Sequence, residues 1–191
     1  MKPIIKGAIT ILLLLSTSGF AQSVKSGVYL SLADYQSHKL TNEIDSKNEK
    51  DKIKLNEIFN KPYITIVSNG KKYKYQKNEI FGYRDCDKVY RFYKKDKYKI
   101  EESDKIFVYS KERHQTQGKN GSTIIVKDYY FSSDIGSEIM PLTVKNLKTT
   151  FPNNLKFNDM LNENFKNGIA YDYDNSHKMF EVNRLYQMSL K

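Results

Sequence analysis

The sequence predicts an α+β fold: an antiparallel β-meander of about six to eight strands followed by C-terminal helices packed on the sheet. Between residues 52 and 132, short alternating runs of β-branched and aromatic residues are separated by charged turns, which is the strand pattern. After residue 142 the apolar residues recur at helical spacing instead. Because strands come first and helices follow, the order argues against alternating βαβ units.

The 191 residues predict an export signal followed by one domain. Lys2 and Lys6 precede the apolar run 9–15, and small residues then lead to Ala21, so residues 1–21 match a cleavable signal peptide. The apolar run is shorter than the roughly 20 residues of a membrane span, and no later segment approaches that length. We therefore expect a soluble, periplasmic or extracellular domain over 22–191, sheet-rich at 52–132 and helical at 142–190.

The chain is basic, with 32 Lys and Arg against 22 Asp and Glu. Removing Lys2 and Lys6 leaves 30 against 22, a net charge of +8. A positive field favours an anionic or glycan ligand or an envelope protein as partner, and nucleic acid is not expected in an exported protein. The lysines are spread along the chain, which is also typical of a solvated basic surface.

The lead-in predicts a strand over 26–30 and a short helix capped by Ser31. The polar stretch 41–51 lacks periodicity and is predicted to be a surface loop. The apolar run 63–67 predicts a strand covered on both faces, and Asn69-Gly70 directly after it indicates a tight hairpin turn.

The hairpin of 80–85 with 88–93 is the centre of the predicted meander. A turn of two residues, Cys86 and Asp87, or of four puts Tyr83 opposite Tyr90 and Phe81 opposite Phe92, whereas a three-residue turn would put Phe81 opposite Arg91. We expect a turn with an even number of residues. One face then carries Phe81, Tyr83, Tyr90, Phe92, Phe107 and Tyr109 beside Lys97 and Lys99, and the other, predicted core face carries Val89, Arg91, Tyr93, Tyr98, Ile100, Ile106 and Val108.

The C-terminal third predicts a loop over 113–121, a long strand over 122–132 and three helices. Thr143 is placed to cap the first helix, which Pro152 stops. A second helix follows to about residue 165, and Ser176 is placed to cap the last.

Four short phrases resemble a group of small uncharacterised secreted proteins of Gram-negative bacteria. They are Gly27-Val28-Tyr29-Leu30, Ile80-Phe81-Gly82-Tyr83-Arg84, Tyr90-Arg91-Phe92 and Thr150-Phe151-Pro152-Asn153-Asn154. The resemblance spans most of the chain after Ala21 and implies export. It implies no activity, ligand or catalytic residue.

No catalytic residue, metal ligand or cofactor is predicted. Cys86, the one cysteine, lies between two aspartates, which disfavour a reactive thiolate, so it is read as structural or as a site of pairing between chains. The three histidines show no ligand spacing. Residues 171–176 carry acids at alternate positions, but His177 stands where a calcium loop needs Gly.

The aromatic and basic sheet face is the one suggestive surface, because rings can stack on sugars while cations hold acidic groups. Its candidate ligand-binding residues are Tyr83, Arg84, Tyr90, Arg91, Lys97 and Lys99. The competing interpretation is that the C-terminal helices bury this face. The sequence thus favours a binding module for an envelope glycan or partner protein. The alternatives are a small hydrolase, in which His114 or His177 meets a carboxylate or Cys86, and a structural or inhibitor-like protein.

Overall fold

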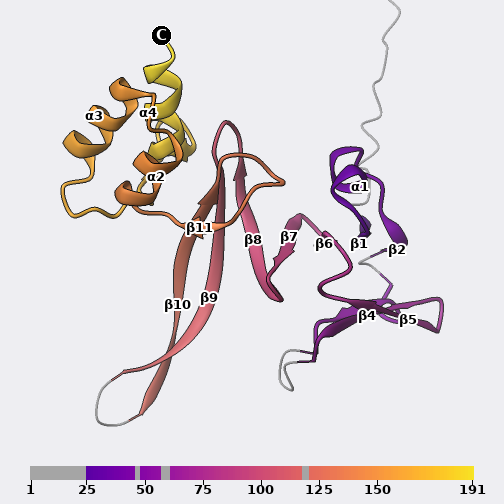
Figure 1. Ribbon diagram of the computed structural model, residues 1–191. Coiled ribbons are helices and arrows are strands. Elements are labelled where there is room, and N and C mark those ends of the chain that lie inside the picture. The colour runs from indigo at the N-terminus through magenta and orange to yellow at the C-terminus, as the bar shows by residue number, and fades with distance from the viewer. Residues whose placement is uncertain (1–24, 46–47, 57–60, 118–120) are drawn as a thin grey trace, which may run out of the picture.

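An eight-stranded antiparallel sheet runs through the molecule, which is described here from a computed structural model covering residues 25–45, 48–56, 61–117 and 121–191 (Figure 1). The strand order is β11-β10-β9-β8-β7-β6-β1-β2. The strands are β1 (Lys25–Tyr29), β2 (Thr41–Asp45), β6 (Gly82–Asp85), β7 (Lys88–Tyr93), β8 (Asp96–Ser103), β9 (Phe107–Gln117), β10 (Ser122–Ser132) and β11 (Met140–Pro141). With helices after the strands, the predicted α+β meander is confirmed.

A second, three-stranded sheet covers one end of the large sheet. It consists of β3 (Lys52–Lys54), β4 (Tyr63–Ser68) and β5 (Lys71–Gln76), and β4 turns into β5 through Asn69 and Gly70, both at positive φ as the sequence predicts. The two sheets share a core made of Val28, Ile44, Ile64, Ile66, Ile80, Tyr83 and Phe92.

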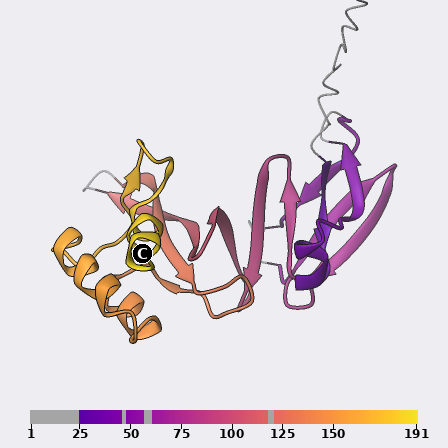
Figure 2. The same cartoon turned by 90° about the horizontal axis from the view of Figure 1, so that it is seen from above.

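The C-terminal helices cover the other end of the same face: α2 (Val144–Thr150), α3 (Leu155–Asn164) and α4 (Glu181–Ser189), with the small β12 (Tyr173–Asp174) and β13 (Met179–Phe180) hairpin before α4. The Thr143 and Asn154 side chains cap α2 and α3. This core includes Ile106, Val108, Phe131, Leu147, Phe157, Leu161, Val182 and Leu185. Figure 2 shows the helices at one end and the N-terminal strands, with α1 (Leu32–Gln36), at the other.

A buried amide fixes α4 to the sheet. Asn183 is fully buried; its Oδ1 accepts from the Ile106 N–H at 2.8 Å and its Nδ2 donates to the Ile106 carbonyl at 2.8 Å. The Glu102 carboxylate accepts from the N–H of Phe180, directly before α4. Since buried backbone groups are costly to leave unpaired, these bonds define where the helix sits.

The predicted register of the β6–β7 hairpin is confirmed. Asp85 pairs with Lys88 across a two-residue turn and Tyr83 pairs with Tyr90, whose rings stack with centroids 4.7 Å apart. Gly82 is required here, because a Cβ at this position would lie 2.0 Å from the Tyr90 carbonyl oxygen.

Phe81 does not join this aromatic face, contrary to the prediction. Its ring lies 4.9 Å from that of Tyr35 and 5.8 Å from the guanidinium of Arg91, which projects from the opposite side of the sheet to Tyr90. Because the strand begins at Gly82, strict alternation does not extend back to Phe81. Ile80 takes its place in the core beneath the second sheet.

A β-bulge in β8 overturns the predicted faces of β9. The register shifts between Ile100 and Glu102, so that Tyr109 pairs with Ile100. The extra residue reverses the alternation. Phe107 and Tyr109 therefore lie with Tyr98 on one face, while Ile106 and Val108 face the helices, the reverse of the predicted assignment.

Three element predictions are also wrong. The predicted loop 41–51 contains the edge strand β2, and the predicted loop from residue 113 is strand through Gln117, because backbone pairing holds polar residues there without an apolar pattern. Ser176 lies in the β12–β13 turn and α4 begins at Glu181. The predicted signal peptide, 1–21, lies outside the described residues. No helix in the described ranges is long and apolar enough to cross a membrane.

Candidate functional site

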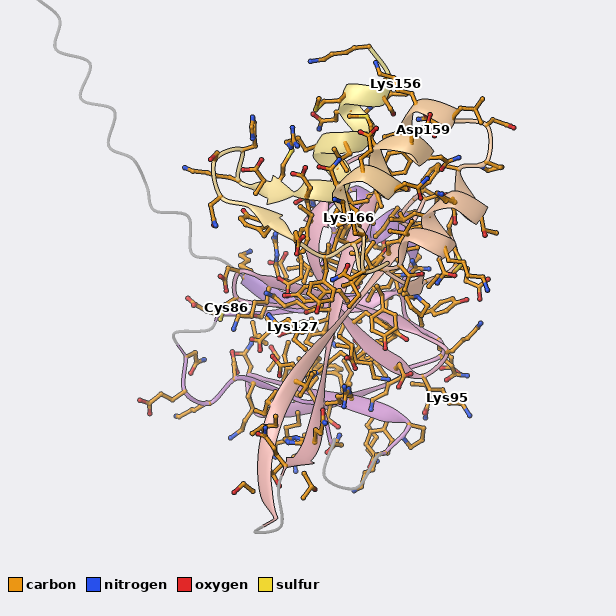
Figure 3. All side chains as sticks on the ribbon, turned by 90° about the vertical axis from the view of Figure 1, so that its left-hand side faces the viewer. Cys86, Lys95, Lys127, Lys156, Asp159 and Lys166 are labelled. Carbon is orange, nitrogen blue, oxygen red and sulfur yellow. The ribbon has the colours of Figure 1, made fainter. Side chains whose placement is uncertain are left out.

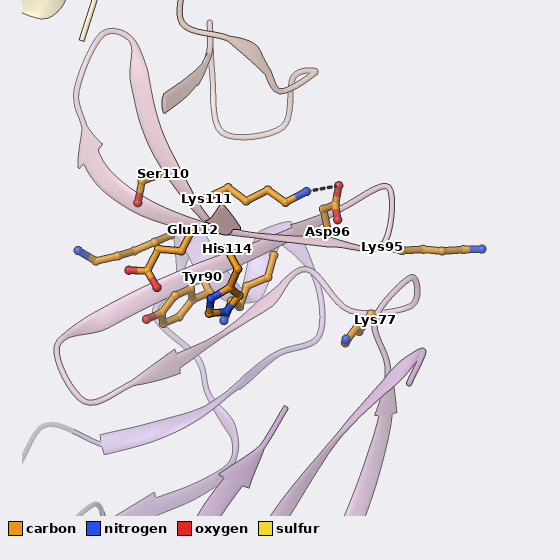
Figure 4. A pocket seen from close by; sticks show the side chains of 10 residues that line it. Lys77, Tyr90, Lys95, Asp96, Ser110, Lys111, Glu112 and His114 are labelled. Carbon is orange, nitrogen blue, oxygen red and sulfur yellow. Dashed lines mark ion pairs between the residues drawn. The ribbon is translucent and has the colours of Figure 1, made fainter. Parts of the chain in front are cut away.

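A groove of about 550 Å³ lies on the large sheet, on the face whose two ends are covered. Its lining comes from β7, β8 and β9, the β7–β8 turn and the residue after β5 (Figure 4). The lining residues are Lys77, Tyr90, Lys95, Asp96, Lys97, Lys99, Ser110, Lys111, Glu112 and His114. Lys111 pairs with Asp96 at 2.8 Å (Figure 4), but five lysines against two carboxylates still make the groove basic.

Strand register builds the floor. Tyr90 pairs with Lys99 and Lys99 with Ser110, so these three side chains form a row across β7, β8 and β9. Glu112 and His114 follow Ser110 at alternate positions of β9 and therefore project from the same face. The groove thus follows directly from strand pairing, with no loop needed to assemble its floor.

Lys77 is the unusual member of the lining. Its residue is 9% exposed, yet its side chain makes no hydrogen bond and no ion pair with any residue that the structure describes. A lysine can bury its aliphatic stem while its ammonium stays accessible, and Lys77 does this at the groove. The backbone N–H of Lys77 donates to the Pro62 carbonyl at 2.8 Å, which fixes its place at the end of β5. The ammonium itself is open to the groove and has no counter-charge in the described chain, so an anion from outside the chain can pair with it.

An aromatic surface accompanies the cations. Tyr90 is half-buried, its ring backed by the buried ring of Tyr83, and the ammonium of Lys97 lies 5.3 Å from its centroid. The stack holds Tyr90 in place at the groove. A fixed phenol ring beside an ammonium can contact a sugar ring and an acidic substituent together.

Glu101 organises the basic residues at the centre of the sheet. Its carboxylate accepts from Lys99 at 2.6 Å and from the Ser110 hydroxyl at 2.6 Å, and Lys127 lies 3.3 Å away. Burial alone would raise the pKa of Glu101, but these hydrogen bonds and cations outweigh it and hold the pKa below its ordinary value. The charged carboxylate therefore positions Lys99 and Ser110.

The β7–β8 turn contains backbone strain beside the groove. Lys94 and Lys95 both adopt positive φ, 49° and 71°, where a two-residue turn of this kind favours Asn-Gly. The left-handed conformation costs a residue with a Cβ about 1–2 kcal/mol. Such strain is common at functional sites, and one of the two strained residues, Lys95, lies at the rim of the groove.

The structure divides the six predicted site residues. Tyr90, Lys97 and Lys99 line the groove. Tyr83 is 1% exposed under the second sheet, so it supports Tyr90 and cannot itself contact a ligand. That cover is the three-stranded sheet and not the helices expected in the competing interpretation.

The two arginines lie on the opposite face. Arg91 is buried and donates to the Tyr109 hydroxyl and to the carbonyls of Gly136 and Ser137, where it holds the β10–β11 connection. Arg84 is half-buried beside Tyr29, whose pKa is raised by burial against the opposing influence of Arg84.

The sequence did not predict seven of the ten lining residues. Glu112 and His114 fall at or beside the segment predicted to be a loop; continuing the strand to Gln117 would have placed both beside Ser110. Lys95, Asp96 and Lys111 could have been placed near the turn from the hairpin register. Lys77 carries no local signal, because its burial depends on how the two sheets meet.

Residue types for nucleophilic catalysis are present but are not assembled. The Ser110 hydroxyl donates to Glu101, and His114 makes no hydrogen bond with the described part of the chain. His177 pairs with Asp174 at 2.6 Å at the exposed β12–β13 turn. Cys86 lies at the β6–β7 turn, far from Lys95 at the other end of β7 (Figure 3).

Within the described ranges, no three His, Cys, Asp or Glu side chains gather as metal ligands. Comparisons with known proteins add no relative: no protein family, no curated protein and no solved structure matches this chain.

Proposed function

We propose that this protein is an exported binding module whose basic groove holds an acidic glycan chain. The observation that carries the proposal is a groove lined by five lysines, among them Lys77, whose side chain has no partner in the described chain. An anionic group in the groove would supply the missing counter-charge.

A sugar polymer fits the groove better than a small anion does. The row of Tyr90, Lys99 and Ser110 offers a ring, a cation and a hydroxyl across three strands. Tyr90 can stack on one sugar while Lys77 and Lys97 bind acidic substituents along the chain. An acidic glycan has this alternation of rings and charges, and the cell envelope or the exterior supplies such polymers to an exported protein.

Calorimetric titration with an oligogalacturonate, which carries one carboxylate on each sugar, tests the proposal. Its neutral methyl ester has the same rings without the charge. We expect the acidic chain to bind, with affinity that falls as salt rises, and the ester to show no binding. Lys77→Met keeps the apolar stem and removes the ammonium, so we expect affinity to fall about 10- to 100-fold, as for loss of one charge-assisted hydrogen bond.

Lys156→Met is the matched control, since it removes the same charge from an exposed position on α3. Its affinity should stay close to wild type. Cys86→Ser should also bind as wild type, because the thiol lies outside the groove. Dextran sulfate serves as a second acidic sugar chain. The proposal is wrong if neither acidic chain binds, or if Lys77→Met and Lys156→Met bind equally well.

A further inference from the structure

Among the residues that the structure describes, none pairs with the outer edge of β10 over the seven residues 122–128. In the described chain β11 pairs only with Tyr130 and Phe131, and the Leu142 N–H donates to the Tyr129 carbonyl. From Ser122 to Asp128, β10 pairs with β9 alone. This part of the β9–β10 hairpin extends beyond the rest of the sheet in Figure 1. Ile125 is 64% exposed and Ile124 37%. A long β-branched edge without proline is a template for another strand.

The direction of the free backbone groups follows from the β10–β11 bond. In an antiparallel ladder the N–H and C=O of one residue point to the same neighbour, and successive residues alternate. Because the Tyr129 carbonyl points to β11, the backbone groups of Lys127, Ile125 and Thr123 point to the same outer side. Each of these three residues therefore offers one donor and one acceptor away from β9.

We infer that this edge pairs with the same edge of a second copy around a two-fold axis at Ile125. The free segment 122–128 is centred on Ile125, so this register uses its full length and stops short of Tyr129, which β11 occupies. Three residues with two backbone groups each allow six hydrogen bonds between the copies. Two residues can exchange these bonds only if the backbone groups of both point outward. Thr123 opposite Lys127 of the other copy, and Ile125 opposite Ile125 of the other copy, meet that condition.

The side chains are self-complementary in this register. Ile125 meets Ile125 of the other copy and Ile124 meets Val126, which buries the exposed apolar residues. Lys127 meets Thr123 and Asp128 meets Ser122, so no charge faces a like charge. Residues 112–128 carry three Lys or Arg and two carboxylates, so the arm is nearly neutral although the whole chain is strongly basic. A second copy is thus favoured over an extended segment of arbitrary sequence.

The dimer would carry both grooves on one side. Pairing around an axis perpendicular to the sheet continues each face into the same face of the partner. Ile125 pairs with His114, which lines the groove, so the grooves open on the face where the two Ile125 side chains meet. Two grooves facing one way could bind one polymer together, which raises affinity through effective concentration. Only this consequence rests on the proposed function.

The molar mass in solution, measured by sedimentation velocity over a range of concentrations, tests the dimer. We expect the wild-type mass to double as concentration rises. Ile125→Lys and Ile125→Glu should each stay monomeric, because each places like charges on the axis, and an equal mixture of the two should regain the doubled mass. Thr116→Lys adds the same charge to the paired strand β9 on the same face and should dimerise as wild type.

Hydrogen exchange identifies the edge. The outward N–H groups of Thr123, Ile125 and Lys127 should exchange more slowly at high protein concentration, and Ile125→Lys should abolish the effect. A wild type that remains monomeric overturns the inference and leaves the edge open to another protein's strand. A dimer that Ile125→Lys does not disrupt, or a mixture that stays monomeric, also overturns it.

Discussion

Two regions of one sheet face differ in what covers them. On β9, Val108 lies under the C-terminal helices, and two residues further along the same face Ser110 opens into the groove. On β7, Phe92 lies beneath the second sheet and Tyr90 reaches the groove edge. The covered ends are apolar, while the middle carries lysines, of which Lys77 has no side-chain partner in the described chain. An uncovered stretch of sheet needs only neutral polar residues. The five lysines here therefore support the proposed binding of an anionic ligand.

The largest expected effect lies at a covered end. Leu161→Ala removes a fully buried side chain from the helical core, and we expect the free energy of unfolding to fall by about 2–5 kcal/mol. Glu112→Ala, in the groove, should change it by less than about 0.5 kcal/mol. Urea denaturation measures both. Equal losses would show that the groove belongs to the folded core.

Asn183→Ala tests how the helical end is attached. The substitution leaves the N–H and C=O of buried Ile106 without their partner, which should cost about 1–3 kcal/mol for each unpaired group. Asn162→Ala, at the surface of α3, is the control and should be near neutral. The same urea titration compares them. A loss below 1 kcal/mol for Asn183→Ala would mean that apolar packing alone holds α4.

The two tight turns should respond in opposite directions. Lys95→Gly relieves a positive φ and should raise the free energy of unfolding by up to about 1 kcal/mol, after allowance for the greater chain entropy of glycine. Gly70→Lys introduces the same strain at φ 77° and should lower it by about 1 kcal/mol. Thermal unfolding gives the stabilities. Lys95→Gly should also weaken oligogalacturonate binding; a variant that is stabler and binds as well as wild type would show that the strain serves no ligand.

Adjacent carboxylates should give opposite pH dependences. The pKa of Glu101 is lowered because its hydrogen bonds and cations outweigh burial, so its contribution to stability is present above pH 4.5 and is lost as pH falls through the lowered pKa. Burial raises the pKa of Glu102 despite the bonds from Phe180 and Asn183, so its contribution is present below pH 4.5 and is lost as pH rises through the raised pKa.

Unfolding free energies from urea titrations between pH 3 and 7 separate the two residues. The stability of wild type relative to Glu101→Gln should increase with pH, and relative to Glu102→Gln it should decrease. If the two stability differences changed with pH in the same direction, Glu101 and Glu102 would not lie in the different environments that the β8 bulge gives them.

The sequence predicted what local patterns determine. The turn at Asn69-Gly70, the Thr143 cap and the Tyr83–Tyr90 register depend on neighbouring residues and were predicted correctly. The prediction of sheet faces failed after the β-bulge between Ile100 and Glu102, because one extra residue moves each later side chain, such as Tyr109, to the other face. Tyr90, Lys97 and Lys99 were placed at the site because they share the hairpin face.

The rest of the groove depended on long-range packing. Lys77 looks like any solvated lysine in the sequence, yet only 9% of the residue is exposed in the fold. Tyr83 has the residue type of a ligand contact, yet β4 covers it. Which part of a sheet face stays uncovered depends on how distant elements pack, and the alternation of residues along one strand does not reveal that packing.

The most direct test of the account is to map binding residue by residue with ¹⁵N-labelled protein and the acidic oligogalacturonate. The account predicts that amide signals shift at Lys77, Tyr90, Lys99 and Ser110, and that Lys77→Met reduces these shifts. Shifts that gather instead at the exposed Tyr171 and Tyr173 beside the helices, with the groove signals unmoved, would contradict it.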